Sequence, residues 1–384
     1  MLLPVTYFLG KSGKVAFFPT YLIGISLISL LGSQEVKRFY YANRSSLLLI
    51  AVFLAYLALS NIWIDQSIRT SALYIGYGLL ILCFISSLAV LEQVFDNFFN
   101  SFLAILAISA CLSVIYSVYF FHALDYQPLV ESRLYALGGI YNPVVSALSY
   151  GAVLILALTH FATSQRLSQR LLYGVSILIL TIGILYTGTR SVWIGLFVSS
   201  FVLLYFLPNI TRLEKRRIII VSQLCLIIIL AVMYKFGLHE SILQRSTSFR
   251  FEIWEAVLST VWNNNLFFGH GLNALEVVRY EKFLFEHPHN IYIATLFYGG
   301  IFGLTMLVAL IGKLLLSLYR ENILPYRIYA ISALSFGLTC LLIDGDKLLT
   351  KINFIWLLFW LPVAIAFIQL KGEKKEPNTN EAVD

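Results

Sequence analysis

Charged residues are scarce in this chain. Asp, Glu, Lys and Arg make up 12% of its 384 residues, and hydrophobic residues make up 59%. Typical soluble domains carry about 25% charged residues, so a water-soluble globular domain is excluded. The mean hydropathy of +0.82 reflects apolar runs of roughly 20 residues, each long enough to cross a bilayer as a helix. These runs lack strand-like alternation, which excludes a β-barrel.

Cysteine is also scarce, and no pair is spaced for a disulfide or a metal. The four cysteines lie inside apolar runs and are expected to pack there: Cys83, Cys111, Cys225 and Cys340. His287 and His289 form an H-x-H pair without a third ligand nearby, whereas zinc sites need three or four. We therefore expect no metal and no cofactor. The net charge of +7 lies mostly in short loops, so we expect no nucleic-acid partner.

The hydropathy pattern predicts an all-α polytopic membrane protein, with residues 1–384 forming a single integral membrane domain. We expect about twelve transmembrane helices, eleven of them clear and one short and N-terminal, near residues 1–9. The clear runs lie near 15–32, 46–63, 71–90, 101–121, 142–162, 171–188, 191–208, 217–236, 290–318, 328–343 and 352–370.

Lys and Arg in the short loops set the predicted orientation, because basic loops stay in the cytoplasm. The basic and polar tail, residues 371–384, is then cytoplasmic, and one large loop, residues 237–289, lies on the outer side. Connections of this length are usually functional or disordered. Within it, five apolar residues follow helical spacing and predict an amphipathic helix on the membrane or capping the bundle: Phe251, Trp254, Val257, Leu258 and Val261.

Cations on the outer side need an explanation, because the orientation rule works against them. Arg190 follows a turn at the start of an apolar run, where a guanidinium suits phosphate oxygens or simply anchors the helix at the headgroups. Arg250 opens the amphipathic helix against the helix dipole, so it favours an anion there. Arg133 and Arg245 are weaker candidates on the same side.

Several other polar residues are candidates at this surface. A histidine at a helix start, such as His289, is either a structural cap or a general base suited to neutral pH. Asn290 could help to place the helix start, and His270 fits a turn. Asp344 or Asp346 either orients a histidine or arginine or belongs to a solvated turn. The glycines that follow permit close helix packing: Gly300 and Gly303.

Four motifs, in order along the chain, resemble the O-antigen ligase and polymerase superfamily of bacterial envelope glycosyltransferases. They are "GGIYNPVVSAL", "YTGTRSVWIGLFV", "SFRFEIWEAVLSTVWNNNLFFGHG" and "HPHNIYIATLFYGGIFGL". The last contains His289 and Asn290, nine further residues, and then Gly300 and Gly303. The resemblance covers roughly residues 130 to 310 and implies a GT-C-like glycosyltransferase architecture.

The resemblance implies roles for three of these residues. Arg190 and Arg250 match arginines that hold the diphosphate of a polyprenyl-linked donor. His289 matches the histidine that acts as base on the acceptor hydroxyl. His287 is not part of the family pattern, so no role is transferred to it.

The expected activity is that of an O-antigen ligase in the bacterial inner membrane, with its site facing the periplasm. It would transfer a glycan from undecaprenyl diphosphate to the lipid A–core oligosaccharide, inverting the anomeric centre without a metal. The closest alternative is an O-antigen or capsule polymerase, which uses the same donor. A lipid-linked glycan transporter or flippase predicts polar groups deep within several spans, whereas here they gather at the outer interface. Membrane lipids are expected partners in every case.

Overall fold

The computed structural model describes residues 2–10, 33–62, 68–95, 97–123, 133–136, 140–207, 211, 213, 250–274, 278–280, 283–285, 287–320 and 326–369. Its helices are α1 (Leu2–Leu9), α3 (Gln34–Leu59), α4 (Ile68–Val94), α5 (Phe98–Ala123), α6 (Pro143–Thr163), α7 (Leu167–Thr187), α8 (Arg190–Phe206), α11 (Arg250–Asn263), α12 (Ile291–Arg320), α13 (Tyr326–Asp344), the π-helix η3 (Trp356–Trp360) and α14 (Leu361–Gln369). Strands β1 (Val278–Tyr280) and β2 (Phe283–Phe285) pair antiparallel.

The protein is an α-helical polytopic membrane protein. Seven helices of the described part are long and apolar enough to cross a membrane: α3, α4, α5, α6, α7, α12 and α13. Two shorter apolar helices cover 190–206 and 356–368. The predicted spans near 15–32 and 217–236 lie outside the described residues, so the number twelve stays a prediction.

One detail differs from the all-α prediction, and the predicted short N-terminal helix is seen to be too short to span. The β1–β2 hairpin adds a small antiparallel pair within the outer segment. Strands of three residues are too short to be predicted from an alternating sequence pattern. Helix α1 has eight residues, which at 1.5 Å per residue is about 12 Å and well short of the roughly 30 Å hydrocarbon layer. It packs against α5 instead, with Phe8 buried and Tyr7 hydrogen-bonded to Ser149 Oγ.

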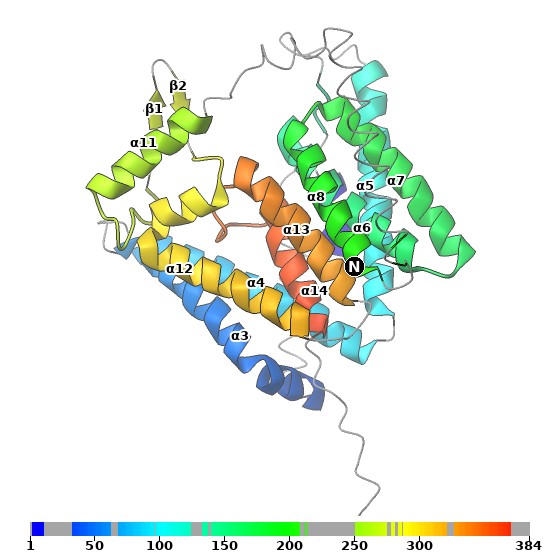
Figure 1. The fold of residues 1–384 in the computed structure, drawn as a ribbon, viewed down its shortest axis with the longest axis horizontal. Helices are drawn as coiled ribbons and strands as arrows, with labels where there is room; N and C mark the ends of the chain where they lie inside the picture. Colours follow the sequence, from blue (N-terminus) through cyan, green and yellow to red (C-terminus); the bar gives the residue numbers. More distant parts are fainter. Residues whose placement is uncertain are drawn as a thin grey trace, which may run out of the picture.

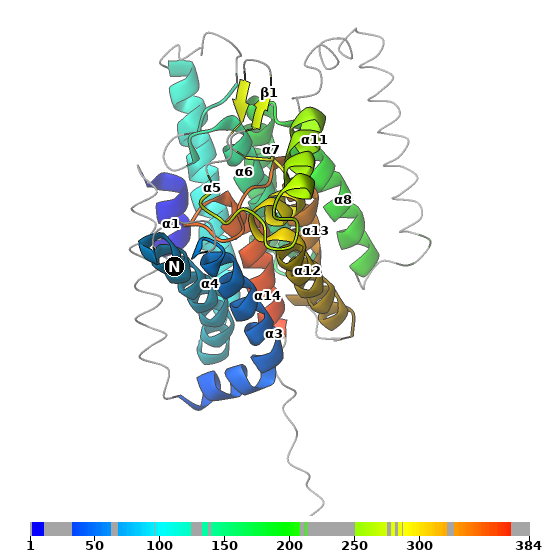
Figure 2. The same ribbon diagram turned by 90° about the vertical axis from the view of Figure 1, so that its left-hand side faces the viewer.

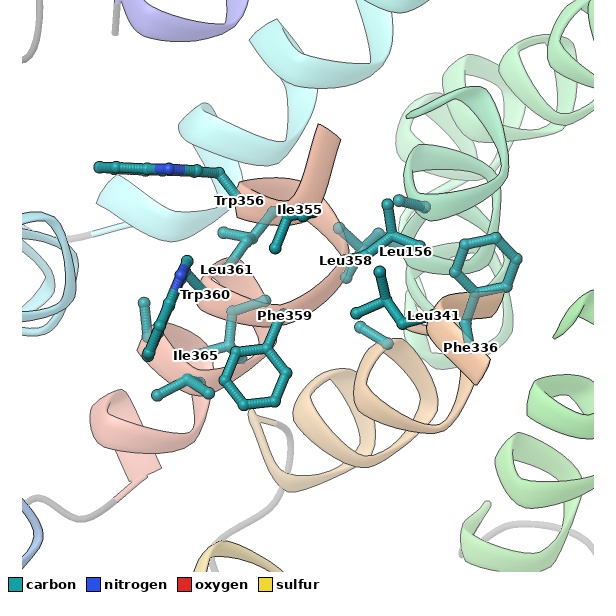
Figure 3. Close-up of a cluster of buried hydrophobic side chains, with 14 of the residues drawn as sticks. Leu156, Phe336, Leu341, Ile355, Trp356, Leu358, Phe359, Trp360, Leu361 and Ile365 are labelled. Carbon is teal, nitrogen blue, oxygen red and sulfur yellow. The ribbon is translucent and has the colours of Figure 1, made fainter. Parts of the chain in front are cut away.

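Helices α6 and α13 are the most enclosed of these spans, whereas α7 and α12 lie at the periphery. In Figure 1, α13 and α14 run between the α3–α4–α12 group and the α5–α8 group. Aromatic and aliphatic side chains of η3, α13 and α14 fill this central layer, as Figure 3 shows around Phe336, Leu358 and Trp360. The buried indole of Trp360 donates to Leu348 O at 2.9 Å, so its one polar group is satisfied.

Helices α8 and α13 pack in close contact. A Cβ at Gly195 of α8 would lie 2.4 Å from Cys340 Sγ, so only glycine fits that approach. The Cys340 thiol also lies 3.8 Å from Ser191 O as a weak donor. Because Ser191 is in the first turn of α8 and Cys340 lies four residues before the end of α13, these two helix ends meet at one end of the bundle. Figure 2 shows α11 and the hairpin at one end of the long helices.

Candidate active site

Helix α11 carries Arg250 and is tied to the end of α13 through it. Arg250 Nη2 lies 2.5 Å from Asp344 Oδ1, with 31% of the Arg250 side chain and 6% of the Asp344 side chain exposed. Arg250 stands at a helix N-terminus and Asp344 at a helix C-terminus, so each charge opposes its own helix dipole. Pairing them offsets both mismatches, although 93 residues separate them in sequence.

The pair uses only part of its hydrogen-bonding capacity. Arg250 Nε and Asp344 Oδ2 are buried and have no hydrogen-bond partner within the described part of the chain. A bidentate arginine–carboxylate pair would satisfy both. The single contact therefore leaves guanidinium and carboxylate atoms for a further polar group.

The face of α11 that contacts the bundle consists of Ile253, Val257 and Val261, all buried. Phe251 and Leu258, from the predicted apolar set, are exposed. The helix thus has two apolar sides, one on the protein and one outward, as expected at a membrane interface. Trp254 is more than an apolar residue, because its indole Nε1 donates to Pro288 O at 2.9 Å. This bond ties α11 to the segment that carries both histidines.

His289 lies directly before α12 in a left-handed backbone conformation. Its φ is +54°, which is uncommon for a residue with a side chain and is found in strained functional segments. The next residue, buried Asn290, caps α12: its Oδ1 accepts from Tyr292 N at 2.9 Å and from Ile293 N at 3.1 Å. A capped helix start holds the preceding imidazole in one place. The rings of His287 and His289 are 4.1 Å apart.

The surroundings of His289 keep its imidazole neutral. Burial is the largest cause, and together with the neighbouring His287 and Arg250 it lowers the pKa of His289 to about 4. At neutral pH the ring therefore has a free lone pair and can accept a proton. Because the charge of Arg250 affects the pKa of His289, the predicted donor-binding arginine and the predicted base share one electrostatic environment.

A turn after α13 packs against the start of α12 and completes this cluster. A Cβ at Gly345 would lie 2.5 Å from Ile291 N, so the turn and the helix start touch through their backbones.

Burial raises the pKa of Asp346, while His287 and Lys347 oppose that rise. Lys347 Nζ lies 4.7 Å from the centre of the Tyr298 ring, and the Tyr298 hydroxyl donates to Asp346 Oδ1 at 3.5 Å. The sequence predicts no role for His287 or Tyr298, because only the fold brings them to Asp346.

Helix α12 is kinked where the predicted glycine motif lies. Gly300 has φ +63° and ψ −165°, so Ile301 N and Phe302 N cannot reach the carbonyls one turn back. The Asn- and Gly-rich turn after α11 replaces those hydrogen bonds. Four backbone bonds join turn and helix: Ile301 N to Leu266 O (2.9 Å), Phe302 N to Phe267 O (3.3 Å), His270 N to Phe297 O (2.8 Å) and Gly271 N to Tyr298 O (2.9 Å).

This turn–helix clamp, defined by residues 266–271 and 297–302, fixes the far end of α11. The His270 ring stacks on the Phe297 ring, with 4.6 Å between the ring centres, and so stabilises the clamp. Gly303 lies on the face of α12 toward α3, where an added Cβ would be 3.5 Å from Tyr56 Cε1. The two motif glycines therefore stand in different settings, one at a kink and one at a helix–helix contact.

Arg190 begins α8 and is exposed. The turn before it is held by Arg133, whose Nε donates to Thr187 O at 2.7 Å and whose Nη2 donates to Thr189 Oγ1 at 3.1 Å. Thr189 in turn donates to Pro143 O at 3.2 Å. Gly188, at φ +62°, ends α7 and makes this tight turn possible. Arg133 thus positions the start of α8.

Arg190, with the turn before α8, lies at the same end of the bundle as the Arg250–Asp344 pair. Ser191 contacts Cys340, and Asp344 follows Cys340 by four residues, or about 6 Å of helix. The structure thus brings Arg190, Arg250, His289 and Asp344 to the same end. Arg245 lies outside the described residues.

Two comparisons with known proteins show what the chain is similar to. Residues 175–308 match the family described as O-antigen ligase. A Pseudomonas aeruginosa protein named O-antigen ligase is 30% identical over 244 residues, which cover 63% of this chain and 58% of that protein. The chain thus spans less than two thirds of the relative's length. Both comparisons support the O-antigen ligase superfamily, and so confirm the resemblance predicted from the motifs.

Proposed function

We propose, from this similarity to the O-antigen ligase superfamily, that the chain is an inner-membrane glycosyltransferase. It transfers a glycan from undecaprenyl diphosphate to the lipid A–core oligosaccharide at the periplasmic face. The observation that carries the proposal is the position of His289 beside the helix of Arg250, where the Trp254 Nε1 bond to Pro288 O ties the two segments together, at the membrane end where α8 begins with Arg190.

The donor diphosphate is the group that the arginines suit. Guanidinium groups bind phosphate oxygens in a bidentate manner and keep their charge at any pH. Arg250 makes a single bond to Asp344 and leaves its buried Nε without a partner in the described chain. A diphosphate oxygen would use that Nε, and the guanidinium would offset the charge that grows on the leaving group.

His289 supplies the other half of the reaction. Its imidazole nitrogen accepts the proton of the acceptor hydroxyl while that oxygen attacks the anomeric carbon. The bond from the anomeric carbon to the diphosphate oxygen breaks, and its electron pair leaves with undecaprenyl diphosphate. Attack from the side opposite the leaving group inverts the anomeric centre. A lowered pKa makes His289 a weaker base, but it keeps the ring unprotonated beside a cationic site.

The test is glycan transfer in a strain that lacks this gene, complemented with variants. Arg190→Ala, Arg250→Ala and His289→Ala are expected to abolish transfer while the protein still inserts in the membrane. Arg320→Ala, an exposed arginine at the far end of α12, is the matched control and should keep activity. Wild-type transfer by His289→Ala would refute the base assignment, and loss of transfer with a chelator would refute the metal-free reaction.

The lipopolysaccharide of the deletion strain separates ligase from polymerase. Loss of every capped form, with lipid-linked polymer accumulating, supports a ligase. Core carrying a single repeat unit instead identifies a polymerase, which uses the same donor with another lipid-linked glycan as acceptor.

A further inference from the structure

A groove of about 570 Å³ lies between α3 and α4, away from the candidate active site. Its lining residues include Lys37, Tyr40, Arg44, Leu47, Leu48 and Leu82. We call it the α3–α4 groove. Its α3 residues recur three or four positions apart and so form one stripe along the helix.

The groove is at the opposite membrane surface from the candidate active site. Tyr56, near the end of α3, donates to Gly299 O beside the clamp at 2.7 Å. Lys37 precedes Tyr56 by 19 residues, or up to about 28 Å of helix, close to the thickness of the hydrocarbon layer. Figure 2 shows the start of α3 at the end of the bundle away from α11.

The stripe changes character along its length. After the buried Val36 come Lys37, Tyr40, Tyr41 and Arg44, followed by Leu47, Leu48 and Ala51. Tyrosine and basic side chains suit the headgroup region, and aliphatic ones suit the hydrocarbon region. Lys37 and Arg44 are exposed, and neither forms an ion pair within the described residues. Leu48 is 65% exposed, so the apolar end is open to an acyl chain.

We infer that the α3–α4 groove binds an anionic phospholipid of the adjacent leaflet. Its phosphate lies between Lys37 and Arg44, and one acyl chain follows Leu47, Leu48 and Ala51. This polarity matches the groove, since the basic end faces the membrane surface and the apolar end faces the membrane interior. The binding site is independent of the glycan-transfer proposal, because the groove and the candidate active site lie at opposite membrane surfaces.

The test is lipid binding to purified, delipidated protein, followed by native mass spectrometry during titration with phosphatidylglycerol or phosphatidylcholine. Wild type is expected to retain phosphatidylglycerol preferentially. Each of Lys37→Gln and Arg44→Gln should weaken that binding about fivefold, the effect of about one basic contact at an anionic membrane surface. Arg38→Gln is the matched control, because Arg38 is exposed on the same helix but does not line the groove.

A second variant tests the apolar end without changing charge. Ala51→Trp fills the groove and should reduce retention of phosphatidylglycerol, while Arg38→Gln should not. The inference is overturned if wild type binds both lipids equally. It is also overturned if Arg38→Gln weakens binding as much as Arg44→Gln, or if Ala51→Trp leaves binding unchanged.

Discussion

Replacing Gly300 with alanine tests whether the clamp holds the candidate active site together. Gly300 has φ +63° and ψ −165°, a region that essentially only glycine adopts. A Cβ there would lie 2.2 Å from Phe267 O and 2.6 Å from Phe268 N. Both are backbone atoms that cannot rotate away, so the clash is relieved only if the turn and α12 separate.

The cost follows from the bonds that would be lost. Four backbone hydrogen bonds join the turn to α12, and each contributes about 0.5–1.5 kcal/mol net. Separation therefore destabilises the fold by about 2–6 kcal/mol, and any backbone strain that remains adds about 1–3 kcal/mol. Because the turn continues from α11, separation also releases the helix that carries Arg250, so glycan transfer should fall as well.

Two glycines of the same helix serve as controls. A Cβ at Gly303 would lie 3.4 Å from Thr295 O, an ordinary contact, and one at Gly312 would have nothing within 4 Å. Gly312→Ala should gain up to about 1 kcal/mol from helix propensity, and Gly303→Ala should change little. Thermal unfolding of the purified protein in detergent, with transfer measured in the complemented strain, compares the three. Equal unfolding temperatures for Gly300→Ala and wild type would refute the clamp.

Three further predictions concern the charged residues of the site. Transfer by the wild type, measured as kcat/KM, should fall on acidification through about pH 4, because His289 then gains a proton. His287→Ala should move that fall to higher pH, because it removes a neighbour that lowers the pKa of His289, and an unmoved pH profile would contradict this. Asp344→Asn should destabilise the fold by about 1–3 kcal/mol, which is less than the loss of a fully buried ion pair costs, because Arg250 is partly exposed. Inorganic pyrophosphate should raise the unfolding temperature of this variant more than that of wild type. Arg133→Ala should reduce transfer by releasing the turn before α8, and Arg133→Lys should not restore it, because lysine lacks the forked geometry; full activity of the lysine variant would contradict this.

The local pattern of the chain predicted much of the membrane architecture. The apolar runs near 46–63, 71–90, 101–121, 142–162, 171–188, 290–318 and 328–343 correspond to helices long enough to span. Hydropathy is a property of neighbouring residues, so it can be read without the fold. The helix of residues 250–263 was predicted for the same reason, whereas its bundle-facing residue Ile253 was not. Two apolar faces on one helix cannot be told apart until one of them is packed.

The motifs also pointed to the superfamily, because glycine, histidine and arginine stand at fixed local spacings there. What only the tertiary structure decided are contacts between distant segments. Arg250 meets Asp344 across 93 intervening residues, Trp254 reaches Pro288, and the turn after α11 replaces the hydrogen bonds lost at Gly300. Hydropathy and spacing determine which residues reach a membrane surface. Which of them touch there depends on how the helices pack, and packing is set by the whole chain at once.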